Sequence, residues 1–168
     1  MKQLFLFFAL FPFYLFAQQT LPTTSTYPKV VGYMSIVNPI VTVYSNETIT
    51  NFTTDYTVGF PVGVNILKSD KIGFSFEITP FIKTTSDNSY VSNLLFHPGV
   101  ILRFPKGFSI NNRLAFETSG RYGYTPVFSK VIAKTKMHNF FVAMPLPVRF
   151  GNKKSMSIGA GLQVGITF

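Results

Sequence analysis

The stretch Ser155-Met-Ser-Ile-Gly-Ala-Gly-Leu-Gln-Val-Gly-Ile-Thr-Phe168 decides the fold. Apolar side chains occupy every even position from Met156 to Phe168, while serine, glycine, glutamine or threonine occupies every odd position. Successive side chains of a β-strand point to opposite faces, so this alternation gives each face one kind of side chain. The stretch therefore predicts a long strand with one apolar face.

The same alternation recurs upstream. It predicts strands at 30–44, 56–66, 72–83, 90–104, 108–121, 127–134 and 139–150. The segment 127–134 has the weakest pattern and is included partly because it makes the number of strands even. In 30–44 the alternation falters at Asn38-Pro39, where we expect a bulge. Turn residues at 68–71, 86–89, 105–107 and 151–154 separate the segments. We therefore expect eight strands joined as antiparallel hairpins.

Composition narrows the class of protein. The chain has 168 residues, enough for one domain, and is 46% hydrophobic, 17% aromatic and only 12% charged. Such a chain is too hydrophobic for disorder, and it has no apolar run beyond the N-terminus that is long enough for a membrane helix. It contains no cysteine, which excludes disulfides, thiolate metal sites and a lipidated cysteine.

The N-terminus is typical of a secretory signal peptide. Met1-Lys2 is basic, residues 4–16 are almost entirely apolar, and Ala17 precedes a polar segment. We expect a signal peptide at 1–17, cleaved before Gln18, then a flexible Thr/Pro-rich lead-in at 18–28 and one domain at 29–168. An N-terminal membrane anchor is the alternative, although the apolar run is short for a bilayer.

Alternation alone does not say which face meets water, because soluble barrels and sandwiches alternate too. The predicted strands are longer than the 5–6 residues usual in globular proteins and long enough to span a bilayer at a tilt. Their non-apolar faces carry mostly small residues, which suits a narrow lumen better than a water-exposed surface. Aromatic residues gather at strand ends, as in membrane barrels: Tyr44, Tyr56, Phe104, Phe108, Phe150 and Phe168. We therefore predict an all-β, eight-stranded antiparallel up-and-down transmembrane β-barrel.

In that arrangement both ends of the barrel face the periplasm. Loops near 45–53, 85–89, 122–127 and 151–154 then face outward, and turns near 68–71, 105–107 and 135–137 face the periplasm.

The signal peptide, the hairpin count and the last strand ending in Phe168 resemble the small outer-membrane β-barrel proteins of Gram-negative bacteria. The segments 96–99, 120–126 and 145–151 are similar to uncharacterised members from Bacteroidota. The resemblance implies an outer-membrane location and a C-terminal signal that the barrel-assembly machinery reads. That signal maps to Gly161, Leu162, Val164, Ile166 and Phe168. The absence of tryptophan departs from the usual aromatic girdles.

Long polar side chains fall on the non-apolar faces. These candidate lumenal residues are Glu77, His97, Arg103, Arg113, Glu117, Arg121 and Arg149. Arg113, Glu117 and Arg121 are spaced by four within the predicted strand 108–121 and should point the same way. An unpaired charge inside a closed barrel is costly, so we expect a paired network that fixes strand register. The alternative is an anion or proton path lined by excess arginine, although eight strands normally leave no open channel.

No motif indicates catalysis. His97 and His138 lack metal-site spacing, and no G-x-S-x-G is present, although a Ser/His/acid triad stays open because its members need not be close in sequence. We expect no enzyme activity, no cofactor and no metal. The net charge of +9 comes largely from lysines in turns, where lipid phosphates are the natural contact, so nucleic acid is not an expected partner.

The favoured interpretation is a monomeric outer-membrane barrel with a structural or small-partner-binding role. Two alternatives remain open. One is a secreted soluble barrel that binds an apolar ligand, as lipocalins do. The other is an outer-membrane enzyme that modifies lipid.

Overall fold

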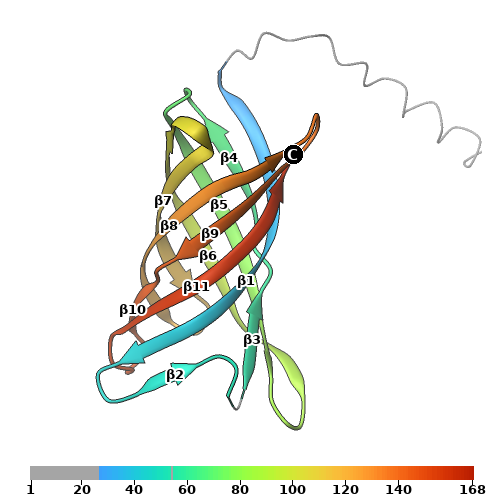
Figure 1. The fold of residues 1–168 in the computed structure, drawn as a ribbon. Coiled ribbons are helices and arrows are strands. Elements are labelled where there is room, and N and C mark those ends of the chain that lie inside the picture. The colour runs from blue at the N-terminus through green and yellow to red at the C-terminus, as the bar shows by residue number, and fades with distance from the viewer. Residues whose placement is uncertain (1–26, 54) are drawn as a thin grey trace, which may run out of the picture.

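The computed structural model describes residues 27–53 and 55–168. The predicted signal peptide and residues 18–26 of the lead-in lie outside the described residues. One antiparallel sheet takes up most of the described chain and curls into a closed barrel (Figure 1). Within these ranges no helix combines the length and apolar character needed to cross a bilayer.

The sheet contains eleven strands that form a ring of eight barrel strands. β3 and β4 are halves of the second barrel strand, β9 and β10 are halves of the seventh, and the short β2 lies beside β1 in the first loop. The strands are β1 (Lys29–Tyr44), β2 (Thr48–Thr50), β3 (Tyr56–Gly59), β4 (Val62–Leu67), β5 (Ile72–Thr84), β6 (Ser89–Phe104), β7 (Phe108–Glu117), β8 (Arg121–Lys134), β9 (Asn139–Pro145), β10 (Val148–Gly151) and β11 (Ser157–Thr167).

Pairing of the first strand with the last closes the ring. β1 runs antiparallel to β11 from the pair Tyr33–Thr167 to the pair Tyr44–Ser157. The predicted eight-stranded antiparallel barrel is therefore confirmed. We call the end where β1 begins and β11 ends the terminal end, and the opposite end the loop end (top and bottom of Figure 1).

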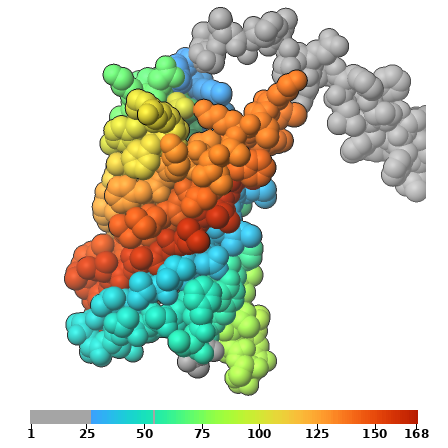
Figure 2. All heavy atoms as spheres, in the orientation of Figure 1, coloured from blue at the N-terminus to red at the C-terminus, as the bar shows by residue number. Residues whose placement is uncertain are grey.

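The apolar faces point outward. On β11, Ile158 and Leu162 are 50% and 47% exposed, whereas Ser157, Gly159, Gly161 and Gln163 are buried. β5 repeats the pattern, because Phe74 and Phe76 are about half exposed while the alternating Ser75 and Glu77 are buried. On the side that Figure 2 shows, side chains cover the barrel wall, and the β8–β9 hairpin projects at the terminal end. The barrel is thus apolar outside and polar inside.

The boundary between the fifth and sixth barrel strands differs from the prediction. β7 ends at Glu117, residues 118–120 form the turn, and Arg121 begins β8. Gly120 adopts a φ of +81°, which suits glycine in a tight turn. The predicted loop at 122–127 is therefore wrong, as is the placement of Arg121 on the same strand as Arg113 and Glu117. Tyr122 and Tyr124 continue the outward-facing pattern in place of that loop.

The bulge predicted in the first strand is confirmed, since the β1–β11 register shifts between Pro39 and Val41. The extra residue reverses the alternation, so Tyr44 faces the lumen, where its ring centroid lies 5.6 Å from the Arg121 guanidinium carbon. The placement of Tyr44 among lipid-facing aromatics is therefore wrong. The other predicted girdle residues are exposed: Tyr56, Phe104, Phe108, Phe150 and Phe168.

Candidate functional site

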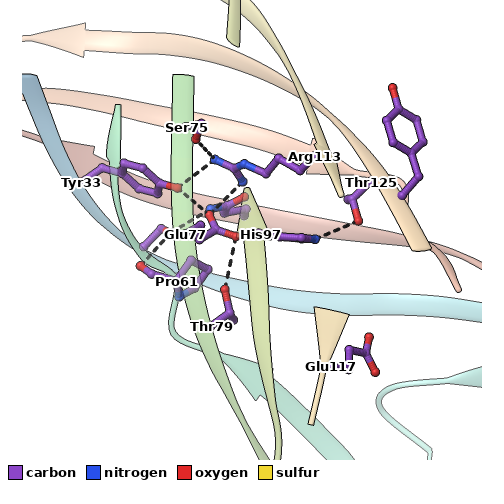
Figure 3. A network of polar contacts seen from close by, with 12 residues as sticks. Tyr33, Pro61, Ser75, Glu77, Thr79, His97, Arg113, Glu117 and Thr125 are labelled. Carbon is purple, nitrogen blue, oxygen red and sulfur yellow. Dashed lines mark hydrogen bonds and ion pairs between the residues drawn. The ribbon is translucent and has the colours of Figure 1, made fainter. Parts of the chain in front are cut away.

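The carboxylate of Glu77 is the centre of a buried polar network in the lumen (Figure 3). Its Oε2 accepts hydrogen bonds from the Tyr33 hydroxyl at 2.9 Å and from Arg113 Nη1 at 2.8 Å. Its Oε1 lies 3.0 Å from His97 Nδ1 and accepts a bond from the Thr79 hydroxyl at 3.2 Å. The partners come from β1, β5, β6 and β7, so one carboxylate links four strands.

Strand register explains how Tyr33 reaches this carboxylate. Glu77 lies opposite His97 on β6 and opposite Gly63 on β4, and Gly63 in turn lies opposite Tyr33 on β1. Directly opposed residues share a face of the sheet. Since Gly63 has no side chain, the Tyr33 ring crosses it and its hydroxyl meets the next strand.

Arg113 uses a second glycine in the same way. Gly99 on β6 lies between Arg113 on β7 and Ser75 on β5. The Arg113 side chain crosses Gly99, and its Nη2 donates to the Ser75 hydroxyl at 3.0 Å and to the Tyr33 hydroxyl at 2.8 Å. Lumenal glycines therefore serve as gaps through which long side chains connect strands that are not direct neighbours.

A second ion pair adjoins the first. Arg149 Nε donates to Glu117 Oε1 at 2.6 Å, and Arg149 Nη1 donates to the Thr125 hydroxyl at 2.9 Å. His97 joins the two pairs, because its Nε2 lies 3.1 Å from the Thr125 hydroxyl and 3.4 Å from Arg149 Nη2. A guanidinium can only donate, so Nε2 is the acceptor and the ring proton lies on Nδ1, facing Glu77.

Five of the seven candidate lumenal residues meet in this network, namely Glu77, His97, Arg113, Glu117 and Arg149. Arg121 lies nearer the loop end, where its Nη2 donates to the carbonyls of Arg149 and Ser155 and to the Ser157 hydroxyl. Arg103 lines the lumen near the terminal end, and among the described residues it makes no hydrogen bond or ion pair with the network.

Sequence reasoning missed Tyr33, Ser75, Thr79 and Thr125 as members of the network. Each is polar and occupies an inward position, which was the available signal. Nothing in the sequence singles them out from the other small polar residues of the lumen, because their partners are set by the cross-strand register.

The side chains Thr125, His97 and Glu77 have the connectivity of a hydroxyl, imidazole and carboxylate triad. Catalysis by such a triad needs a nucleophile that a substrate can reach. Thr125 is 1% exposed, and its hydroxyl already accepts a bond from Arg149. The adjoining cavity, about 70 Å³ in volume, is far below the size of ordinary ligand sites. The arrangement therefore favours polar packing over acyl transfer.

The network divides the lumen into two cavities. The smaller one, about 70 Å³, lies beside Glu77 and His97 and is lined mainly by apolar residues, with prolines at positions 39, 61, 145 and 147. The larger one, about 410 Å³, lies toward the terminal end and includes Tyr33 and Arg103 in its wall. Arg113 lines both cavities and so stands at the partition.

A closed eight-stranded antiparallel barrel, apolar outside and polar within, is the architecture of a transmembrane β-barrel. The chain matches no model of a protein family, and no curated protein matches it. It is similar to a solved de novo designed transmembrane β-barrel, with a TM-score of 0.52 and 9% identity over 87% of this chain and 98% of that one. A second designed barrel, solved by solution NMR, has a TM-score of 0.48 and 10% identity over 87% and 97%. The first likeness shows the fold alone.

Proposed function

We propose that this protein is an integral outer-membrane β-barrel that performs no catalysis and has a structural or small-partner-binding role. The observation that carries the proposal is the inverted distribution of side chains. Phe74, Phe76 and Leu162 face outward, whereas the Glu77–Arg113 and Glu117–Arg149 ion pairs are inside. A wall of this kind is stable where lipid surrounds it.

The interior also argues against a lipocalin-like carrier. Such a carrier needs an apolar cavity large enough for its ligand. Here charged and hydrogen-bonded groups cross the middle of the lumen, and the apolar cavity beside them is about 70 Å³. The polar network thus supports a closed barrel that neither carries a large apolar ligand nor conducts ions.

Export and assembly complete the proposal. The signal peptide at 1–17 directs the chain across the inner membrane, and β11 carries the signal for barrel assembly. Leu162, Val164 and Phe168 are 47%, 46% and 59% exposed, so their side chains are accessible along the outer face of the closing strand. In the expected orientation the terminal end faces the periplasm, the outer wall contacts lipid, and the closed ring is compatible with a monomer.

Fractionation and gel mobility test the proposal. The full chain is expressed in a Gram-negative host, and its membranes are separated from the soluble periplasm and washed with urea. We expect the protein in the urea-resistant outer-membrane fraction, with unboiled samples migrating differently from boiled ones because the closed barrel survives detergent. Recovery of the protein from the soluble periplasm without detergent would contradict the proposal.

A further inference from the structure

The larger lumenal cavity has the features of a binding site. Its volume of about 410 Å³ falls within the range usual for small-molecule sites. Side chains from β1, β4, β6, β7, β8, β9 and β11 surround it, with Tyr33 and Arg113 of the buried network in its wall. The cavity is therefore built by most of the barrel.

The charge of this cavity is strongly unbalanced. Lys29, Arg103 and Lys134 line it, against one acidic side chain, Asp70, which accepts a hydrogen bond from the Tyr27 hydroxyl. Within residues 27–53 and 55–168, none of the three cations lies in an ion pair. A cleft with an excess of one charge and low-dielectric walls concentrates ions of the opposite sign.

Two deeply buried groups in the cavity wall have unused hydrogen-bonding capacity. Arg113 and Asn111 are 3% and 7% exposed. Arg113 Nε and Asn111 Oδ1 find no hydrogen-bond partner among the described residues, although buried polar atoms are nearly always paired. Arg113 Nε can only donate, so its natural partner is an acceptor such as an anionic oxygen.

Part of the remaining wall, which also contains apolar side chains such as Leu67 and Phe141, is suited to hydroxyl groups. Ser109, Ser129, Asn139 and Thr167 supply both donors and acceptors. One arginine and two lysines outside any ion pair, facing one carboxylate, favour a ligand with more than one negative charge. A phosphate monoester carries about −1.5 to −2 at pH 7, and arginine forms bidentate bonds to phosphate.

We propose that this cavity binds a small soluble phosphate ester with a hydroxylated body, entering from the terminal end of the barrel. The inference rests on the proposed function, because membrane insertion leaves the ends of the lumen as its routes to water. It specifies the small partner as an organic anion and places its phosphate among Arg103, Lys134 and Arg113.

The test uses the full chain refolded in lauryldimethylamine oxide micelles and calorimetric titration with glucose 6-phosphate. Glucose serves as the uncharged control and inorganic phosphate as the anion without a body. We expect saturable binding of glucose 6-phosphate, weaker binding of phosphate and none of glucose. Failure of glucose 6-phosphate to bind the folded barrel, or equal binding of glucose, would overturn the inference.

Two double variants test whether the ligand binds in this cavity. Arg103→Gln with Lys134→Gln should weaken binding of glucose 6-phosphate by about tenfold or more, since bonds to charged groups are among the stronger ones. The matched control, Lys153→Gln with Lys154→Gln, removes the same charge at the loop end and should leave affinity unchanged. If both double variants bind glucose 6-phosphate equally weakly, the proposed location of the site is wrong. Lys29→Gln, at an exposed position, gives a second variant that should also weaken binding.

Two further measurements separate the remaining outcomes. Adding phosphatidylglycerol to the micelles, with phosphatidylcholine as control, tests whether a lipid headgroup is the ligand. If phosphatidylglycerol but not phosphatidylcholine displaces glucose 6-phosphate, and this effect requires Arg103 and Lys134, the ligand is a lipid headgroup. That result would overturn the proposal of a soluble ligand. The mobility of unboiled samples reports barrel formation independently, so loss of the mobility shift in the unaltered chain would count against the proposed function instead.

Discussion

The ring of Tyr33 lies directly across Gly63, and its hydroxyl bonds to Glu77 on the far side of that glycine at 2.9 Å. A Cβ atom on Gly63 would lie 2.4 Å from Cζ and from the hydroxyl oxygen of Tyr33. No real Cβ contact is that short, so the ring and any side chain at position 63 exclude one another. The glycine is therefore a requirement of the network and not merely a small residue in a narrow lumen.

Gly63→Ala should destabilise the barrel by about 1–3 kcal/mol, the usual cost of overpacking a filled interior. Urea unfolding in micelles, followed by the mobility of unboiled samples, measures the change. In a Tyr33→Ala background the same substitution should cost less, because the ring is gone and a backbone contact with Phe76 remains. Equal costs in the two backgrounds would mean that Tyr33 does not set the requirement for glycine.

Glu77→Gln should destabilise the barrel by about 3–5 kcal/mol, since it leaves the buried Arg113 without its counter-charge. The same unfolding assay applies. The double variant Glu77→Gln with Arg113→Met removes both charges and should recover much of the lost stability. A double variant that is less stable than Glu77→Gln alone would show that Arg113 does not depend on this carboxylate.

An arginine introduced on the outer wall should destabilise the barrel more, the closer its position is to the middle of the bilayer. Ile78 lies in the middle of β5 and is 48% exposed, so Ile78→Arg should cost about 2–4 kcal/mol, whereas Ile158→Arg, near the loop end of β11, should cost less. Gln163→Ser changes an inward residue and serves as the control. The yield of folded barrel in phospholipid vesicles provides the measurement. Equal yields for all three variants would argue against a lipid-facing wall.

Arg121 should protect the last loop from proteolysis. Its guanidinium bonds to the carbonyl of Ser155, close to the exposed Lys153 and Lys154. Arg121→Met should accelerate tryptic cleavage after these lysines by about tenfold, since loss of bonds to a charged group favours local opening. Mass spectrometry identifies the cut sites, and cleavage at Lys136 in the opposite turn should not change. A general increase at both ends would indicate global destabilisation.

The alternation of apolar and polar residues in β11 and β5 was enough to predict the barrel. Alternation within a strand does not depend on how that strand is aligned with its neighbours. The ends of the strands were harder to predict. The predicted loop at 122–127 is instead part of β8, where Arg121, Gly123 and Thr125 face inward and pair with β7 and β10. Tyr44 was misplaced because a single extra residue near Pro39 reverses the alternation after it.

The sequence was enough to predict which kinds of residue form the network, but not which of them pair with one another. Charged residues that face inward can be recognised because they alternate with apolar residues along each strand. The pairing of Glu77 with Arg113 depends instead on the register between β5, β6 and β7 and on the space left by Gly99. Arg103 lies on the neighbouring strand to Glu77 but belongs to the cavity near the terminal end. The spacing of residues within a strand shows which face of the sheet a side chain is on. The register between strands decides how far along the barrel axis that side chain lies.

The pairing of β1 with β11 leaves the sheet without a free edge. The backbone of Gly32 exchanges hydrogen bonds with Phe168, at 3.0 and 2.9 Å, so pairing along the seam extends beyond the end of β11 at Thr167. Without this pairing, both borders of the sheet would carry unpaired amides and carbonyls, which hydrocarbon cannot solvate. Pairing of β1 with β11 removes these borders, and so the closed ring, unlike an open sheet of the same strands, is compatible with hydrocarbon around it.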